Sequence, residues 1–390
     1  MVAVGTHPGP IGRALVPECG GSDIPDPGIL ADMSLDTPFP HHGPLDPAEV
    51  TGRDDLIDDL IERISGHRPT VLVAPRRFGK TSVLGCIDQR LGETITVIRV
   101  DLYELRSWAD LAARLDDALV AVPAARRRGL DRVAASLEVS LGLVKATLTK
   151  PSRPEPDVTV DRLLDVIVAH AQSTPTVLVL DEFSSIVRVD GAAGLLRTKF
   201  QHHYQRLGLL FAGSEPSTMQ MLFTDTDQPF YAQADLVDVA PLSLLALTDV
   251  LERGFDGMVP AGLAARIRDF TDGHPQRSMQ LADAAWSAWN DGVEQAAVWA
   301  EALDRCRRAT ADSHETRFSA LPSADQAVMR LAANGGVLFG REAEFLSLSR
   351  SSAQAGRARL VERGQIIEAE RGVVVVDPLY ADWIRMRFPG

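Results

Sequence analysis

The segment that most constrains the fold is residues 70–82, which read Thr-Val-Leu-Val-Ala-Pro-Arg-Arg-Phe-Gly-Lys-Thr-Ser. A short apolar strand runs into a loop with the spacing G-x-x-x-x-G-K-S/T, except that Ala74 stands where the first glycine is usual. Such a loop surrounds a phosphate with backbone N–H groups at the start of the next helix. The pattern predicts a strand–loop–helix unit that binds nucleotide phosphates. An ordinary glycine turn between a strand and a helix is the alternative.

The side chains of this loop have separate predicted roles. Lys80 is one of only four lysines among 40 basic residues, and we expect it to reach the β- and γ-phosphates and to act in catalysis. The Thr81 hydroxyl is expected to bind Mg²⁺. Ala74 is compatible with the loop if its φ is negative, because alanine avoids positive φ. The other predicted nucleotide contacts of the loop are Pro75, Arg76, Arg77, Phe78, Gly79 and Ser82.

Length and composition limit the class of protein. A chain of 390 residues has room for two or three domains. The net charge of −13 argues against a protein whose whole surface coats nucleic acid. No apolar run approaches the about 20 residues that span a bilayer. The three cysteines have neither disulfide nor metal-ligand spacing, which fits a reducing compartment. We therefore expect a cytoplasmic protein without membrane segments.

The order of expected elements predicts the fold class and the domains. Strands alternate with helices through residues 46–242, which is typical of an α/β domain with a parallel sheet covered on both faces. Residues 1–45 are rich in Pro, Gly and His without periodicity and are expected to be a flexible tail or a wrapping arm. Residues 243–314 have helical spacing throughout. Residues 315–390 read as three short helices followed by two short strands. The expected sheet strands are 71–74, 95–100, 176–180, 209–212 and 236–239.

A second motif lies at the end of the strand 176–180, where Asp181 and Glu182 follow the apolar run. Asp181 would hold Mg²⁺ through water, and Glu182 would orient and polarise an attacking water as the catalytic carboxylate. Because one further strand separates this motif from the phosphate loop, both strand ends should meet at one edge of the sheet. The alternative is that the two acids only cap a buried strand.

Two weaker signals follow in the chain. Ser214 comes directly after the strand 209–212, where it would touch the γ-phosphate or the lytic water; capping of a helix that begins near Pro216 is an equal alternative. Gly273-His274-Pro275 precedes a helix that begins near Arg277. A common turn explains this triplet, but Pro275 would also be placed to press on the adenine and Arg277 to reach the phosphates.

With these elements in this order, residues 46–388 resemble the archaeal-type ATPase family of the AAA+/STAND P-loop NTPases. The matching motifs are Gly52-Arg53, the loop from Pro75 to Ser82, the Asp-Glu strand end, Ala212–Ser214, Pro229–Tyr231, Gly273–Pro275 and Asp377–Tyr380. The resemblance implies a P-loop NTPase sheet followed by a helical lid and a C-terminal winged helix. It also implies ATP and Mg²⁺ as ligands, with Gly52 and Arg53 among the nucleotide-binding residues.

The chain departs from this family after Pro-Phe-Tyr. Many relatives have Gly-Arg there, whereas this chain has Ala232-Gln233. A glutamine cannot neutralise the charge that develops on the γ-phosphate, and an arginine finger is worth about 10³-fold or more in rate. Either Arg197 or Arg206 takes its place, or hydrolysis is slow. A slow hydrolyser is better described as a switch than as a motor.

The third helix of the expected winged helix, 351–363, carries Arg357, Arg359 and Arg363, as a DNA recognition helix would. However, residues 320–390 hold nine arginines against eight acids, and three of the acids flank the face that would meet DNA. We therefore favour packing or docking of a protein partner over DNA binding. The pairs His41-His42 and His202-His203 lack metal-ligand partners and read as surface or linker residues.

The sequence thus predicts a cytoplasmic ATP·Mg²⁺-binding ATPase that acts as a nucleotide-dependent switch. Its expected ligands are ATP and ADP, and a protein partner or a second copy of the chain is a further expectation. Two alternatives stay open: an ATP-regulated DNA-binding initiator or regulator, and a nucleotide-bound scaffold with negligible turnover.

Overall fold

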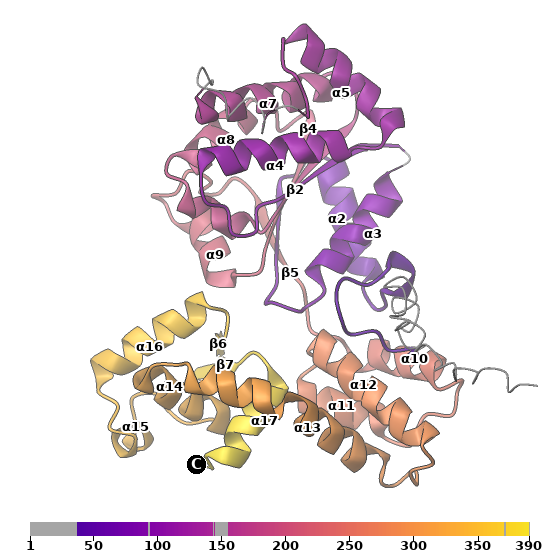
Figure 1. The fold of residues 1–390 in the computed structure, drawn as a ribbon, viewed down its shortest axis with the longest axis vertical. Coiled ribbons are helices and arrows are strands. Elements are labelled where there is room, and N and C mark those ends of the chain that lie inside the picture. The colour runs from indigo at the N-terminus through magenta and orange to yellow at the C-terminus, as the bar shows by residue number, and fades with distance from the viewer. Residues whose placement is uncertain (1–36, 93, 143, 145–154, 370–371, 390) are drawn as a thin grey trace, which may run out of the picture. The chain divides into compact units, whose positions relative to one another are not determined.

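Five parallel strands form the central sheet, in the order β2–β3–β4–β1–β5 (Figure 1). The computed structural model describes residues 37–92, 94–142, 144, 155–369 and 372–389. Each strand lies within two residues of its expected position, so the prediction of a parallel α/β sheet is confirmed. The strands are β1 (Thr70–Val73), β2 (Thr96–Asp101), β3 (Thr176–Asp181), β4 (Leu207–Gly213) and β5 (Asp235–Asp238).

Helices cover both faces of the sheet because side chains alternate along each buried strand. Val71 and Val73 point into one hydrophobic cluster, and Leu72 and Ala74 point into another. The second cluster is closed by α2 (Asp54–Ser65) and α3 (Lys80–Leu91), which follow the short 3₁₀ helix η1 (Pro47–Glu49). The first is closed by α4 (Trp108–Ala121), α5 (Ala124–Ser136), α7 (Pro156–Ala171), η2 (Phe183–Arg188), α8 (Ala192–Phe200) and α9 (Pro216–Thr224).

The register of the sheet brings three functional loops together. Val73 is paired with Gly213, and Leu180 with Phe211. Because all strands run in the same direction, the phosphate loop, Ser214 and the Asp-Glu motif emerge at the same edge of the sheet. The strand order β3–β4–β1 places Ser214 between the other two.

Four helices follow the sheet and have a hydrophobic core of their own, as expected for a lid. They are α10 (Leu244–Gly254), α11 (Leu263–Thr271), α12 (Pro275–Asn290) and α13 (Val298–Ser319), and we call them the lid. Phe39 is fully buried in this core, and a Cβ on Gly254 would lie 2.2 Å from its ring. The tail boundary expected at residue 45 is therefore wrong: the compact unit begins at Pro38. The rest of the expected tail, residues 1–36, lies outside the described residues.

The C-terminal segment has the element order expected for it, with one addition. It contains α14 (Ser323–Asn334), α15 (Arg341–Phe345), α16 (Arg350–Glu362), an antiparallel hairpin of β6 (Ile366–Ala369) and β7 (Gly372–Val375), and α17 (Pro378–Arg387). The sequence did not predict α17. The boundary expected at residues 314/315 falls inside α13, which continues to Ser319. No helix in the described part of the chain is long and apolar enough to cross a membrane.

Four phenylalanines pack together beneath the end of β3. Phe183, Phe211, Phe223 and Phe230 have ring centroids between 4.8 and 5.9 Å apart, and all four are buried. Phe183 directly follows the catalytic candidate Glu182 in the chain, so this cluster anchors the backbone that carries Glu182. The burial of Phe230 in this cluster accounts for the phenylalanine at the centre of the Pro-Phe-Tyr motif.

We expect Phe230→Ala to lower the free energy of unfolding of the sheet segment by about 3–5 kcal/mol, because it leaves a cavity among three rings. The measurement is native-state hydrogen exchange at the amides of β4. Tyr231→Ala is the matched control, since that neighbouring side chain is 45% exposed and its removal should cost about 0.5 kcal/mol or less. Equal losses in the two variants would contradict this account of the cluster.

Candidate functional site

The phosphate loop keeps its shape without a glycine at position 74. Ala74 is fully buried, and its N–H donates to the Gly213 carbonyl at 3.3 Å. The positive φ values of the loop lie at Arg77 (70°) and Gly79 (85°), and Ala74 has none. The alanine is therefore tolerated because the chain makes its left-handed turns farther along the loop.

Lys80 joins the phosphate loop to the end of β3. Its ammonium lies 3.0 Å from Asp181 Oδ1 and 2.7 Å from Glu182 Oε1, and its side chain is buried. The other oxygen of Glu182 accepts hydrogen bonds from the Ser214 backbone N–H at 3.2 Å and from its hydroxyl at 2.7 Å. Four side chains from three adjacent strand ends thus form one connected polar group.

Glu182 itself has a left-handed backbone, with φ 50° and ψ 42°. This conformation is uncommon for a residue with a side chain and costs about 1–3 kcal/mol. The lysine and the serine hold its carboxylate in place against this strain. A strained acid at the end of a buried strand is typical of a site in which the position of the carboxylate matters.

The structure distinguishes the two interpretations of Ser214. Helix α9 begins at Pro216 with Glu215 as its N-cap, and no side chain caps it. The Ser214 hydroxyl is used by Glu182 instead. The helix-capping interpretation is therefore not supported.

Arg99 is a site residue that sequence reasoning missed. Its guanidinium donates to Asp181 Oδ2 at 2.8 Å from the neighbouring strand β2. Burial by itself raises the pKa of Asp181, but Lys80 and Arg99 together outweigh it, so the pKa of this carboxyl is lower than usual. Asp181 is thus a stable anion. An arginine within the apolar run Ile95–Val100 was the available signal.

Thr81 and Asp181 line a pocket of about 470 Å³ that also includes Glu182 and Asp101. Among the described residues, no cluster of three or more His, Cys, Asp or Glu side chains could hold a metal ion by itself. A Mg²⁺ ion usually takes one or two protein oxygens and completes its coordination with waters and substrate phosphates. One hydroxyl and one anionic carboxylate beside a phosphate loop fit that requirement.

A second pocket, of about 580 Å³, adjoins the first and shares Thr81 and Glu182 with it. It brings together most of the predicted nucleotide contacts. The predicted site residues that line it are Pro75, Arg76, Arg77, Gly79, Lys80, Thr81, Ser82, Glu182, Ser214 and Pro275.

Four predicted nucleotide contacts do not line either pocket: Gly52, Arg53, Phe78 and Arg277. Gly52 packs against α10, where a Cβ would lie 2.5 Å from that of Ala246. Arg53 is buried, which lowers the pKa of its guanidinium, and its Nη2 has no hydrogen-bond partner in the described part of the chain. The Phe78 ring packs edge-on against His274, with centroids 4.9 Å apart.

One wall of the larger pocket comes from a segment that the sequence had assigned to the tail. Residues 40–45 line the pocket, including His41 and His42, so the linker interpretation of this histidine pair is wrong. Leu45 N–H donates to the Ser82 hydroxyl at 3.0 Å, and Gln276 Nε2 donates to the His41 carbonyl at 3.2 Å. The segment is thus fastened to both α3 and the lid. Phe39, a large apolar residue directly before this segment, was the signal in the sequence.

Comparison with known proteins supports the arrangement at the level of the fold. The chain is similar to the Walker-type ATPase of Pyrococcus abyssi, with 18% identity and a TM-score of 0.65, over 89% of this chain and 99% of that one. It is also similar to the ORC2 protein of Aeropyrum pernix, solved as ADPNP–ADP complexes, with 14% identity and a TM-score of 0.51, over 90% and 98%. The chain has the fold of the AAA+ P-loop NTPases. No protein-family model and no curated protein matches the sequence.

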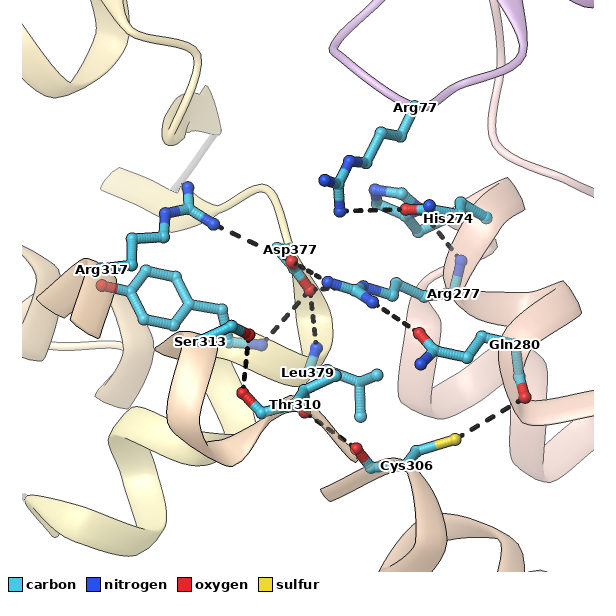
Figure 2. A network of polar contacts seen from close by, with 12 residues as sticks. Arg77, His274, Arg277, Gln280, Cys306, Thr310, Ser313, Arg317, Asp377 and Leu379 are labelled. Atoms are coloured by element: carbon cyan, nitrogen blue, oxygen red, sulfur yellow. Dashed lines mark hydrogen bonds and ion pairs between the residues drawn. The ribbon is translucent and has the colours of Figure 1, made fainter. Parts of the chain in front are cut away.

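Within this AAA+ fold, Arg277 does not line the larger pocket. Its guanidinium donates to both carboxylate oxygens of Asp377, at 2.9 and 2.5 Å, and to Gln280 Oε1 (Figure 2). The expectation that it reaches the phosphates is therefore not met in this arrangement, because an aspartate from the C-terminal segment holds it. Sequence spacing could not reveal a partner that lies 100 residues away.

The two substitutes considered for the arginine finger also lie outside both pockets. Arg206 directly precedes β4, so it lies at the opposite edge of the sheet from Ser214. Arg197 lies on α8, with its buried Nε unpaired among the described residues. Neither arginine can complete the site of its own chain in this AAA+ arrangement.

The arginines of α16 are engaged within the C-terminal segment. Arg359 pairs with the fully buried Asp325, and Arg357 pairs with Glu368 on β6. Helix α16 also packs against α9 of the AAA+ sheet, and a Cβ on Gly364 would lie 3.9 Å from the Ser214 carbonyl oxygen. These contacts occupy the helix that would read DNA.

Two buried histidines near Asp377 predict a pH-dependent stability. Burial lowers the pKa of both His274 and His314 from 6.5 to about 4. Between these values the unfolded chain binds more protons than the folded one, so stability falls as the pH falls from 6.5 towards 4. At pH 5 each histidine should cost about 2 kcal/mol of the free energy of unfolding relative to neutral pH.

The test is urea unfolding at pH 7 and pH 5. His314→Phe keeps an aromatic ring beside Tyr380 but cannot be protonated, so it should reduce the difference between the two pH values. His202→Gln, at an exposed position, is the control and should leave the difference unchanged. The same pH dependence in wild type and His314→Phe would contradict the assignment.

Proposed function

We propose that the chain is a member of the archaeal-type ATPase family that binds ATP and Mg²⁺ and hydrolyses ATP slowly, as a nucleotide-dependent switch. The observation that carries the proposal is the contact of Lys80 with Asp181 and Glu182 at the mouth of a loop with Walker A spacing. A lysine and an acid that meet there, with a serine on the same acid, are the groups that phosphoryl transfer to water requires.

The polar contacts suggest how these residues work. In the structure, the Lys80 ammonium contacts both the Asp181 and the Glu182 carboxylates. Bound phosphates would compete for the ammonium and leave Glu182 held by Ser214 alone, free to accept a proton from the attacking water. Thr81 and Asp181 would hold Mg²⁺, which neutralises charge on the phosphate oxygens. Arg99 would keep Asp181 anionic and fixed.

Slow turnover follows from the missing arginine. Gln233 stands where the resemblance places the finger, and neither Arg197 nor Arg206 lines either of the two pockets described above. A cation for the transition state would have to come from a second copy or another partner, as arginine fingers often do. A chain that holds ATP for a long time is suited to a switch.

For the C-terminal segment we propose a winged-helix module that docks a protein partner or a second copy of the chain. DNA binding is the weaker alternative, because Arg357 and Arg359 already pair with acids and α16 packs against α9. A protein that reads DNA presents such arginines to phosphates and bases instead.

Lys80→Ala should abolish measurable ATP binding, with a loss of about 100-fold or more, because it removes the cation expected to contact the β- and γ-phosphates. It also removes the ion pair of Glu182, whereas Asp181 keeps Arg99. Glu182→Gln should retain ATP but lower turnover by about 100-fold or more. Equilibrium binding of a fluorescent ATP analogue and a phosphate-release assay measure the two effects. Lys199→Ala is the control, because Lys199 pairs with Asp161 and Asp165 away from the site. If both variants hydrolyse ATP normally, the proposed function is wrong.

Ser214→Ala should lower turnover by about 10-fold or more while the affinity for ATP changes little, because the serine hydroxyl contacts Glu182 and no capping role is lost. Single-turnover hydrolysis with saturating ATP measures the chemical step. Ser185→Ala, at a buried serine three residues beyond Glu182, is the control. An unchanged rate in Ser214→Ala would show that this contact has no part in hydrolysis.

A further inference from the structure

The first turn of α12 lies between the nucleotide pocket and the C-terminal segment. Pro275, Gln276 and Met279 line the pocket on one face of the helix. On the side of the phosphate loop, Arg77 donates to Gln276 Oε1 at 3.3 Å. Arg277, on another face, holds Asp377 of the C-terminal segment (Figure 2). One helical turn is therefore in contact with both the phosphate loop and the C-terminal segment.

The contact between Arg277 and Asp377 holds the two side chains in a fixed relative position. It is bidentate, and the two residues are only 7% and 8% exposed. The carboxylate is itself held, because Asp377 Oδ1 accepts from the backbone N–H groups of Leu379 and Tyr380 as the N-cap of α17. The planar guanidinium group of Arg277 thus binds a carboxylate whose orientation is already restrained by the backbone of α17.

Apolar packing reinforces this attachment. Leu379, the second residue of α17, is buried in the hydrophobic core of the lid. Helix α17 packs against α11 and α13 of the lid. By contrast, the C-terminal segment meets the sheet through α16 and α9. The start of α17 is thus inserted in the lid beside the turn that faces the nucleotide.

Two arginines and two histidines surround Asp377, and of these only the arginines are charged at neutral pH, because burial lowers the pKa of both histidines to about 4. Arg277 is paired with it, Arg317 lies 3.9 Å away, and His274 and His314 face it from α12 and α13. Removal of the carboxylate would leave buried arginines without a counter-ion beside Arg77 of the phosphate loop. An uncompensated buried charge is strongly unfavourable, so the first turn of α12 would have to move.

We propose that Asp377 is a positioning residue of the nucleotide site. Through Arg277 it holds the first turn of α12, and with it Pro275 and Gln276, against the phosphate loop. The inference rests on the proposed nucleotide binding and deepens it, because it makes a residue of the C-terminal segment part of the nucleotide site. By linkage, a partner that pulls α17 from the lid would weaken nucleotide binding, and bound nucleotide would oppose that partner to the same extent.

The experiment measures the affinities of the full chain for fluorescent ATP and ADP analogues, together with KM and kcat for ATP. Asp377→Asn keeps the size and part of the N-cap but removes the charge. We expect it to raise the Kd of both nucleotides and KM by about tenfold while kcat changes less than about twofold, since the groups at Glu182 are untouched. Asp377→Glu, which keeps the carboxylate, should recover most of the affinity.

Two controls separate positioning from a general loss of stability. Asp325 is also a buried carboxylate paired with an arginine, but its partner Arg359 lies within the C-terminal segment. Asp382 pairs with Arg307 across the same α13–α17 interface, away from α12. Asp325→Asn and Asp382→Asn should lower the melting temperature and leave both nucleotide affinities unchanged.

The outcomes are distinguishable. If Asp325→Asn weakens nucleotide binding as much as Asp377→Asn, the effect is general destabilisation and the inference is wrong. If Asp377→Asn tightens ATP selectively over ADP, Arg277 has been released to the phosphates, which also overturns positioning. If the wild-type chain binds nucleotides and Asp377→Asn binds them equally well, the inference alone is wrong. If the wild-type chain binds neither nucleotide, both the proposed function and the inference are wrong.

Discussion

The contact of Lys80 with Asp181 and Glu182 is the interaction on which the rest of the site depends. It ties the helix that follows β1 to the end of β3, with Ser214 on the strand between them completing the group. The buried Lys80 ammonium contacts the buried carboxylate of Asp181 and the partly exposed carboxylate of Glu182, and loss of any one of these groups leaves a charge with fewer partners. The sheet and the phenylalanine cluster beneath it hold the backbone segments that keep these charged groups in contact.

The same physical principle operates a second time at Arg277 and Asp377. There a buried arginine and a buried carboxylate join two parts of the chain that are otherwise held by apolar contacts such as Leu379. The phosphate loop is connected to both contacts. Lys80 follows it directly, and its residues Arg77 and Phe78 contact Gln276 and His274 at the start of α12, next to Arg277. A movement of the loop would therefore also alter its contacts with the start of α12, which Arg277 connects to α17.

Much of the sheet and of the candidate site around Lys80 could be predicted from the sequence, because the signals are local. A strand of apolar residues that ends in Asp-Glu, or a loop with a fixed lysine spacing, is decided by neighbours within a few positions. Arg99 and residues 40–45 were missed because their contacts arise from the pairing of distant strands and from packing on the lid. The departure of Arg277 from its expected role has the same origin: its partner lies in another segment.

The sequence by itself determined the strand–loop–helix unit, the acids at the end of β3 and the parallel α/β class, since hydrophobic alternation and loop spacing are written in consecutive residues. Only the tertiary structure decided which charges meet. In the fold, Ser214 contacts Glu182 and does not cap a helix, and Arg277 pairs with Asp377 instead of lining the pocket. The proline-rich residues 40–45 form one wall of that pocket. Buried charges must find partners, and the fold, through long-range pairing, decides which partners are within reach.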